Sequence, residues 1–315
     1  MEFEGPVSRR VDDHSVMVKW RGRRGLMEKS GRPGLSAGRV AVVMSPSLAT
    51  LEGVAGRLVL VRGVRAVALG GSRARGTAAP GSDTDLGLYV DEDTDLDGLR
   101  VLAREVGGPA AQLTGRGRWG PVVDGGGWLR IDGDPVDWLY RDVVRVADSV
   151  ADARAGRISW THQTGHPLGV PSVAYAAEVA LGVPLADPNG LLAGARAALD
   201  PYPAALTAAF LAELAVADFV LGALGKPAAR GDIGFVAGTL HRVVGLCAHA
   251  VCARAGRWVT NDKGLVAEAA RQPGAPPDFH RRAEDVLTGL ASAELSAAVD
   301  RAADLVAAVR AASAA

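Results

Sequence analysis

Apolar residues recur at helical spacing at the start of the regular part of the chain. Residues three or four positions apart lie on one helix face, and five apolar ones follow one another in this way: Leu48, Leu51, Val54, Leu58 and Val61. Ser47 directly precedes them and is of a residue type that caps helix N-termini. The pattern predicts a helix that begins near Ser47.

Two strand-like runs follow this helix, separated by a glycine-rich loop. The first is the apolar run VRAVALGG at 64–71, and the second is TDLGLYV at 84–90. A further helix is predicted to open at Thr94 and to end at the glycine pair 107–108. Farther along, two strand-like runs flank the Asp-Gly pair at 132–133, which predicts a β-hairpin with a tight turn.

From about residue 142 onward strand signals disappear and Ala-rich helical patterns replace them. Short breaks rich in Pro, Gly and Asp separate the expected helices, which span roughly 173–182, 189–199, 203–224, 231–255, 261–271, 280–289 and 291–312. Helices joined by short connections are typical of an antiparallel bundle. The predicted fold class is therefore α+β: a mixed β-sheet with flanking helices at 46–150, followed by a C-terminal α-helical bundle at 151–315.

Residues 1–45 differ from the rest of the chain. They are basic, rich in Gly and Pro, and have no apolar period. Such a composition predicts a disordered tail. Met44 stands just before the first helix, so a native start there or close by is an alternative.

Charge and hydropathy limit the kinds of binding partner that we expect for the protein. The chain has 315 residues with 35 basic and 35 acidic side chains, so its formal net charge is zero. A general nucleic-acid or membrane-surface binder usually carries a basic excess, so we expect neither partner. No uninterrupted apolar run reaches the roughly 18 residues of a membrane helix, and the N-terminus lacks the apolar core of a signal peptide. We therefore expect a cytoplasmic protein.

The first chemical candidate is the acidic pair Asp83 and Asp85. Residues two apart on a strand point to the same face, so the two carboxylates project side by side. Adjacent anions in an apolar context repel one another unless a cation lies between them. Oxygen ligands favour Mg²⁺ over Zn²⁺, so the pair predicts a magnesium site. A pair of solvated aspartates at a strand edge is the alternative.

The glycine-rich segment upstream strengthens the first interpretation. Glycine after a buried strand permits a sharp turn and close approach of a ligand. The N–H groups of Gly71 and Ser72, with the Ser72 hydroxyl, can hold phosphate oxygens, and Arg73 and Arg75 add positive charge. A phosphate cradle beside paired carboxylates is what metal-assisted phosphoryl or nucleotidyl transfer requires.

These motifs together resemble the signature of the nucleotidyltransferase-fold superfamily, to which DNA polymerase beta and the kanamycin and lincosamide nucleotidyltransferases belong. Gly71-Ser72, ten intervening residues and Asp83-Thr84-Asp85 match it. Small bacterial nucleotidyltransferase-domain proteins with a helical C-terminal half are similar over most of the chain from about residue 47. The middle residue of the acidic pair is usually apolar in the family, so Thr84 is a departure.

The resemblance also implies a third carboxylate on a neighbouring strand. Asp137 lies between Val136 and Trp138, and if these two face the core, Asp137 faces the site. Its implied role is that of a further metal ligand or of the base for the acceptor hydroxyl. Asp134 is better explained by the turn and Asp142 by a helix N-cap.

Two further features are candidates for ligand contacts. Lys263 lies between two predicted helices, and similar antibiotic nucleotidyltransferases place a lysine of their helical domain near the triphosphate; an exposed lysine after a helix end is the alternative. Trp119 and Trp128 flank a glycine-rich turn and either wall the acceptor pocket or pack in the core.

The implied activity is transfer of a nucleoside monophosphate, AMP from ATP or the equivalent from another nucleoside triphosphate, onto a hydroxyl with release of pyrophosphate. Mg²⁺ is the implied cofactor. By analogy the acceptor is a small antibiotic-like compound that enters on the side of the helical bundle. A protein acceptor, as in antitoxin nucleotidyltransferases, and a catalytically silent nucleotide-binding protein are the alternatives. The oligomeric state is left open, with a homodimer as one candidate.

Overall fold

The computed structural model of the chain describes residues 46–291 and 295–314. All of them fall within one compact unit. The predicted tail at 1–45 lies outside the described residues.

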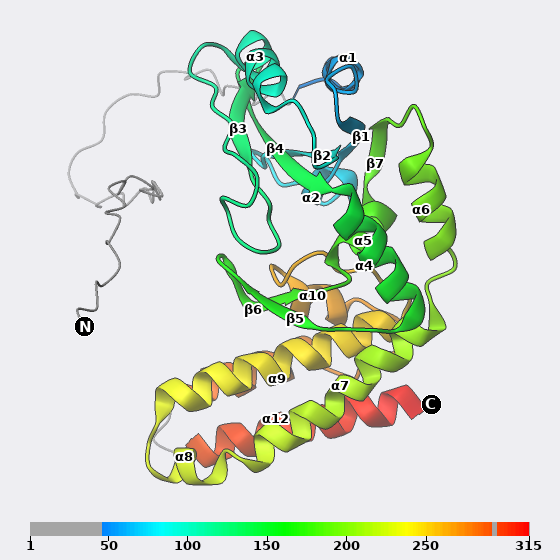
Figure 1. The fold of residues 1–315 in the computed structure, drawn as a ribbon. Coiled ribbons are helices and arrows are strands. Elements are labelled where there is room, and N and C mark those ends of the chain that lie inside the picture. The colour runs from blue at the N-terminus through cyan, green and yellow to red at the C-terminus, as the bar shows by residue number, and fades with distance from the viewer. Residues whose placement is uncertain (1–45, 292–294, 315) are drawn as a thin grey trace, which may run out of the picture. The chain divides into compact units, whose positions relative to one another are not determined.

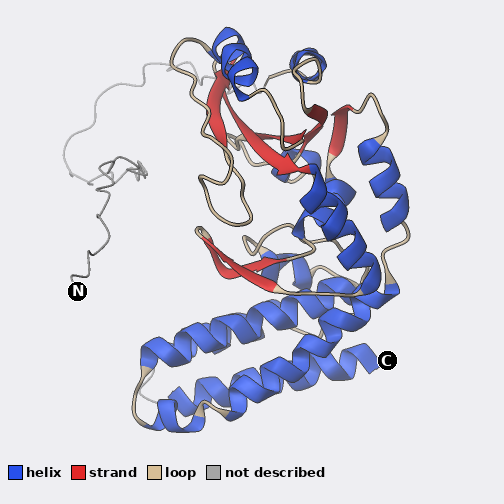
Figure 2. Ribbon diagram, viewed as in Figure 1, coloured by secondary structure: helices blue, strands red, loops and turns tan. Residues whose placement is uncertain are grey.

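A five-stranded mixed sheet forms the N-terminal half (Figure 1, Figure 2). Its order is β3-β4-β2-β1-β7, with β1 at Val64–Leu69, β2 at Thr84–Val90, β3 at Gly126–Ile131, β4 at Asp134–Asp142 and β7 at Val183–Ala186. β2 and β4 are parallel, and the other neighbouring pairs are antiparallel. The predicted α+β class is confirmed.

A side-chain cap precedes the first residue of each of the two helices on one face of the sheet. α1 covers Leu48–Leu58, and the Ser47 hydroxyl accepts from the Thr50 N–H, as predicted. α3 covers Leu96–Gly107, but its cap is Asp95 rather than Thr94. The expectation for Thr94 was wrong because its hydroxyl donates instead to two backbone carbonyls, those of Gly63 and Asp91.

The predicted hairpin around residues 132–133 is confirmed as β3 and β4. Asp132 and Gly133 both have positive φ, 54° and 86°, as a type I′ turn requires. Along β4, Val136 and Trp138 are fully buried, so Asp137 between them faces the other side of the sheet.

Each face of the main sheet has its own core. One face packs with α1 and α3 through residues such as Leu51, Leu86, Leu99 and Trp138. The other face carries the smaller side chains Ala66 and Ala68, which pack with α4 (Val143–Ala155), α5 (Ala174–Leu181) and α6 (Leu191–Leu199). Small residues on this face leave room for a cavity beside the helices.

A third core lies in the helical half, where the predicted helices are found within a few residues. They are α7 (Ala204–Gly222), α9 (Ile233–Arg254), α10 (Leu265–Ala270), α11 (Phe279–Thr288) and α12 (Leu295–Ala314). The short helix α8 (Gly225–Ala229), where a break was expected, and a 3₁₀ turn (Gly289–Ala291) were not predicted. α9 supplies the longest run of buried residues, from Val243 to Ala253.

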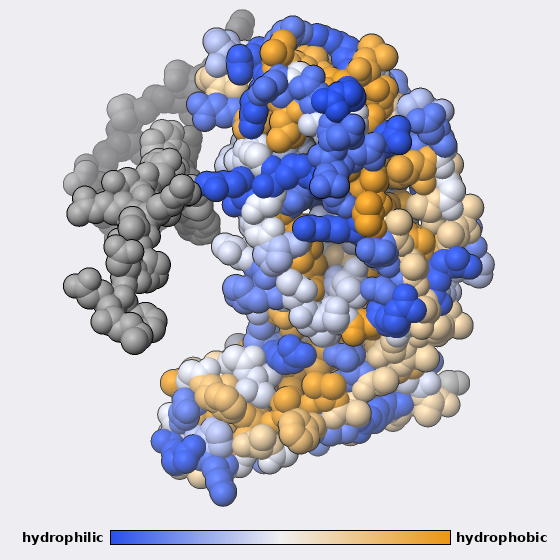
Figure 3. Space-filling model, in the orientation of Figure 1, coloured by the Kyte–Doolittle hydropathy of each residue, from blue (hydrophilic) through white to orange (hydrophobic). Residues whose placement is uncertain are grey.

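Among the described residues of this half, two stretches are long and apolar enough to cross a membrane by length and hydropathy, Ala204–Ala229 and Ile233–Arg254. In the second stretch, 67% of the apolar 18-residue window is buried, so its apolar composition follows from its central place in the core. In the first stretch, 28% of the corresponding window is buried. Apolar side chains are visible at the surface of the helical half in Figure 3, and Phe219 of α7 is an exposed one.

The expectation that strands end near residue 142 was wrong. β5 (Trp160–Gln163) and β6 (His166–Pro171) form a separate antiparallel hairpin, and β7 pairs with β1 at the edge of the main sheet. These strands have four to six residues and little alternation, so their local pattern is weak. The sheet thus includes residues well beyond the boundary drawn at 150.

Candidate active site

The candidate site begins where β1 turns into the short helix α2 (Gly71–Ala74). The Gly70 N–H donates to the Asp85 carbonyl at 2.8 Å, which brings this turn against β2. Gly71 has φ +61°, and a Cβ there would lie 1.7 Å from the Asp85 Oδ2. Glycine is therefore required for the turn to lie directly over this carboxylate.

Two of the three predicted carboxylates are cross-strand neighbours. Asp85 and Asp137 are register partners in the parallel pair β2–β4, so both project from the same face. Asp83 lies two residues before Asp85, just ahead of the strand, and is exposed. The structure brings the three acidic residues to one end of the β2–β4 pair.

The electrostatics of these carboxylates reflect burial and mutual repulsion. Burial first, then the charges of Asp85 and Asp83, raise the pKa of Asp137 to about 7. Burial also raises the pKa of Asp85, where the guanidinium of Arg141 opposes the shift. Carboxylates that repel one another at a ligand-accessible place fit a divalent cation with a preference for oxygen ligands. Asp83, Asp85 and Asp137 are the side chains that would hold it.

Among the residues that the structure describes, no three His, Cys, Asp or Glu side chains are gathered tightly enough to form a metal site. The magnesium site therefore stays a prediction.

A cavity of about 290 Å³ opens over this face of the sheet. Ala68, Gly87, Asp85 and Asp137 belong to its sheet side. The segment between α9 and α10 contributes its residues 260, 261 and 263. The cavity is close to the lower limit of small-ligand pockets, roughly 300 Å³.

A buried ion pair joins the sheet to α5 beside this cavity. The Arg141 guanidinium donates to both carboxylate oxygens of Glu178. It also lies over the Tyr175 ring, 5.4 Å from the centroid. The Arg141 side chain is 6% exposed, so the pair is a fixed part of the cavity wall.

Cationic side chains gather where the turn after β1 meets the helical half. The Arg75 Nη1 donates to the Thr260 Oγ1 at 3.3 Å, and Lys263 lies three residues farther along the same segment. A second cavity of about 200 Å³ shares Arg75, Thr260 and Lys263 with the first. The two cavities therefore adjoin at a cationic border.

The predicted phosphate ligands are not all at the cavity. Gly71 and Lys263 line it, whereas Ser72 and Arg73 do not. The Arg73 guanidinium donates to the carbonyls of Ser82 and Asp83, the former at 2.5 Å, and so holds the loop before β2. Arg73 therefore stabilises the conformation of this loop.

The residues that sequence reasoning missed are Arg141, Glu178 and Tyr175. Arg141 lies four positions after Asp137 on the same strand face. This spacing could have indicated from the sequence that Arg141 faces the site. Glu178 is the single charged residue of the apolar helix AYAAEVAL. Their mutual contact depends on the packing of α5 against β4, which no local pattern encodes.

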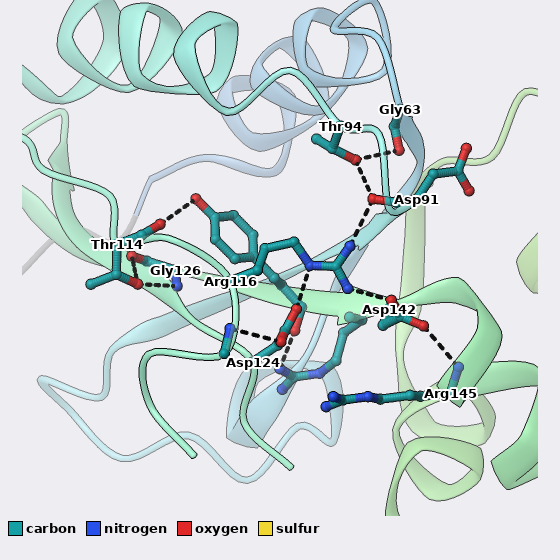
Figure 4. Close-up of polar contacts among 12 residues, drawn as sticks. Gly63, Asp91, Thr94, Thr114, Arg116, Asp124, Gly126, Asp142 and Arg145 are labelled. Carbon is teal, nitrogen blue, oxygen red and sulfur yellow. Dashed lines mark hydrogen bonds and ion pairs between the residues drawn. The ribbon is translucent and has the colours of Figure 1, made fainter. Parts of the chain in front are cut away.

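A second polar network fixes the loop that leads into β3 (Figure 4). Arg116 donates to the carboxylates of Asp124 and Asp142 and to the Asp91 carbonyl. Asp142 also caps α4, as predicted, by accepting from the Arg145 N–H at 3.0 Å. The loop at 114–125 is therefore tied to the end of β4.

The aromatic pair predicted as wall or core residues is not in the core. The Trp119 and Trp128 rings stack with centroids 4.7 Å apart, and Trp128 is 68% exposed. Both lie outside the lining of the first cavity.

Comparison with known proteins finds a matching family for the segment that contains the glycine turn and the acidic pair. Residues 52–113 match the family model of the nucleotidyltransferase domain. This segment therefore carries a nucleotidyltransferase domain, in agreement with the resemblance noted from the sequence. The matched segment of the nucleotidyltransferase domain contains Gly71, Asp83 and Asp85, and it ends before Asp137.

A solved structure is also similar to this chain. It is the crystal structure of a nucleotidyltransferase-like protein from Exiguobacterium sibiricum, with 10% sequence identity and a TM-score of 0.41 over 82% of this chain and 74% of that chain. No curated protein sequence matches the chain. The domain family implies a nucleoside triphosphate as substrate and, as a rule, a divalent metal.

Proposed function

We propose that this nucleotidyltransferase moves a nucleoside monophosphate, AMP from ATP, onto a hydroxyl of a small antibiotic-like acceptor and releases pyrophosphate. In this reaction the acceptor oxygen forms a bond to the α-phosphorus, and the bond from that phosphorus to the bridging oxygen breaks. The hydroxyl proton leaves with a base. The nucleotide, the acceptor class and the metal are parts of the proposal.

The observation that carries the proposal is the contact between the Gly71 turn and Asp85, with Asp137 in register on the next strand. A glycine turn can place backbone N–H groups on a phosphate. The carboxylates are then within reach of the same triphosphate. A nucleotide that bridges turn and carboxylates accounts for both features at once.

The remaining residues have assigned roles in the proposal. Asp83 and Asp85 would hold Mg²⁺, and Asp137 completes the metal site or takes the hydroxyl proton. When bound, the ion neutralises charge that develops on the phosphates. Gly71 holds phosphate oxygens through its N–H group, and Lys263 and Arg75 face the phosphates as cations.

The test is an acceptor screen with ATP and Mg²⁺, read out by pyrophosphate release. We expect release with a hydroxyl-bearing antibiotic-like compound, and we expect Asp85→Asn and Asp137→Asn each to lower kcat by at least about 100-fold, because the metal loses a charged ligand. Asp134→Asn is the matched control, since this carboxylate lies on β4 but not at the cavity.

A second measurement separates the acceptor classes. ATP labelled at the α-phosphate is incubated with protein and cell lysate, and the label is followed. We expect a labelled small molecule. A labelled protein band would assign the reaction to a protein acceptor instead, and ATP binding without pyrophosphate release in the presence of lysate would favour the silent protein.

A further inference from the structure

The stacked pair Trp119 and Trp128 lies beside the carboxylates rather than in a core. Trp128 is the antiparallel register partner of Asp137, so its side chain projects from the same sheet face. The neighbouring residues of β3 that face the core are Leu129 and Ile131, and both are buried. The indole is therefore held next to a proposed catalytic carboxylate, with 68% of its surface exposed.

The stacking partner Trp119 is held by hydrogen bonds from another element. The Gln163 Nε2 on β5 donates to the Trp119 carbonyl at 2.8 Å. The Gln163 Oε1 accepts from the N–H groups of Val122 and Val123 at 3.1 and 3.2 Å. One side chain thus satisfies three backbone groups of the loop. An aromatic pair fixed in this way loses little conformational entropy when a ligand covers it.

The order of strands indicates which reactant reaches the pair. Across the sheet from β1 to β3 the site face carries Ala68, Asp85, Asp137 and Trp128. The Gly71 turn follows β1, so phosphates held by this turn, as the proposed function has it, would lie at the β1 side of the carboxylates. In an in-line displacement the attacking and leaving oxygens are on opposite sides of the phosphorus. The attacking hydroxyl then comes from the β3 side, where Trp128 lies.

We propose that Trp119 and Trp128 form a stacking platform for the ring of a sugar-like acceptor, whose hydroxyl is directed toward Asp137. The inference rests on the proposed function and adds the acceptor class. The faces of the indole rings are electron-rich, and the C–H groups on one side of a saturated ring carry partial positive charge, so the two surfaces attract.

The adjacent carboxylates, and the engagement of two nearby arginines, favour such a ring over a nucleic-acid strand. Arg116 is engaged by Asp124 and Asp142, and Arg130 donates to the Gly133 carbonyl. Arginines engaged in this way are not free for successive phosphates, which a single strand would present. The adjacent carboxylates repel the same phosphates.

The test uses methyl β-D-glucopyranoside as a probe, without nucleotide, and measures binding by ligand-observed NMR. We expect millimolar binding that weakens about tenfold in Trp128→Ala and is restored in Trp128→Phe, because stacking needs only an aromatic ring. Phe219→Ala is the matched control, since it removes an exposed aromatic side chain of α7. Glycerol, which has hydroxyls but no ring, should not bind. Circular dichroism checks that each variant is folded.

Three results would overturn the inference: equal binding of the glucoside by Trp128→Ala, no binding by the wild-type protein, or Trp128-dependent binding of an oligoadenylate RNA in place of the sugar. Calorimetry of Mg–ATP binding to the wild-type protein is measured in parallel. If sugar binding depends on Trp128 but no ATP binds, the inference about the stacking platform is supported and the proposed nucleotidyl transfer is refuted.

Discussion

Gly71 must be glycine for two separate reasons. Its φ of +61° lies in the left-handed region, and a Cβ would collide with the Asp85 carboxylate. Gly76 shares the first condition, with φ +67°, but a Cβ at that position would have no heavy atom within 4 Å. Alanine at position 76 would therefore introduce backbone strain alone, whereas alanine at position 71 would introduce both backbone strain and a collision with the Asp85 carboxylate.

We expect Gly71→Ala to abolish nucleotidyl transfer, because the methyl group displaces the Asp85 carboxylate from its place beneath the turn. Gly76→Ala should lose only about 1 kcal/mol of stability and keep its activity, since it adds strain without a collision. Pyrophosphate release and thermal melting of both variants check this. Equal activity of the two variants would refute a role for the Gly71–Asp85 contact.

Thr84 departs from the apolar residue usual between the paired acids, and the structure shows its consequence. The side chain is fully buried, and its hydroxyl has no hydrogen-bond partner. We expect Thr84→Val to stabilise the protein by about 1 kcal/mol, because an unsatisfied buried hydroxyl is removed at little change in volume. Thr84→Ser, which keeps the hydroxyl and loses the methyl group, should be destabilised. Denaturant melting measures both.

At the scale of elements, the Arg141–Glu178 ion pair joins β4 to α5. Removal of one member leaves the other as an uncompensated charge, and this matters most for Arg141 because it is nearly inaccessible to water. The pair also lines the cavity, so the same contact bears on stability and on the site.

We expect Glu178→Ala to lower the free energy of unfolding by about 3 kcal/mol, the usual cost of breaking a buried pair. Glu105→Ala is the control: Glu105 pairs with Arg57, and both side chains are about half exposed. That loss should stay below about 1 kcal/mol. Similar losses in the two variants, measured by urea unfolding, would contradict the structural importance assigned to the buried pair.

At the scale of the whole molecule, His249 lies where the helical half meets the region of α5 and β5. It is buried, stacks on Phe210 with centroids 5.1 Å apart, and meets the edge of Trp160 at 5.3 Å. Burial lowers its pKa from 6.5 to about 4, although the Asp262 carboxylate opposes the shift. The folded protein therefore holds this imidazole neutral.

Stability should consequently fall with acidification from about pH 6.5 to about pH 5. In this window the unfolded chain takes up a proton that the folded protein excludes, at a cost of about 1.5 kcal/mol. We expect His249→Gln to flatten the dependence of the unfolding free energy on pH. His280→Gln, at an exposed histidine, should leave it unchanged. An unaltered slope in His249→Gln would show that other groups cause the effect.

Most elements with a strong period were predictable from the sequence. α1 with its Ser47 cap, the β3–β4 hairpin and the long helices α7 and α9 follow from side-chain spacing and turn residues, which act over a few positions. The glycine turn and the acidic pair were found in the same way. Their chemistry depends on residue type and short spacing, and both are visible in one segment.

Only the tertiary structure decided which distant residues share the site. β7 joins the sheet beside β1, Arg141 meets Glu178, and Lys263 lines the same cavity as Asp85. Short strands such as β5 and β7 have too few residues to show a period, and their pairing energy comes from partners far away in sequence. Contacts between separate elements depend on how their faces pack, and a linear pattern contains no record of that geometry.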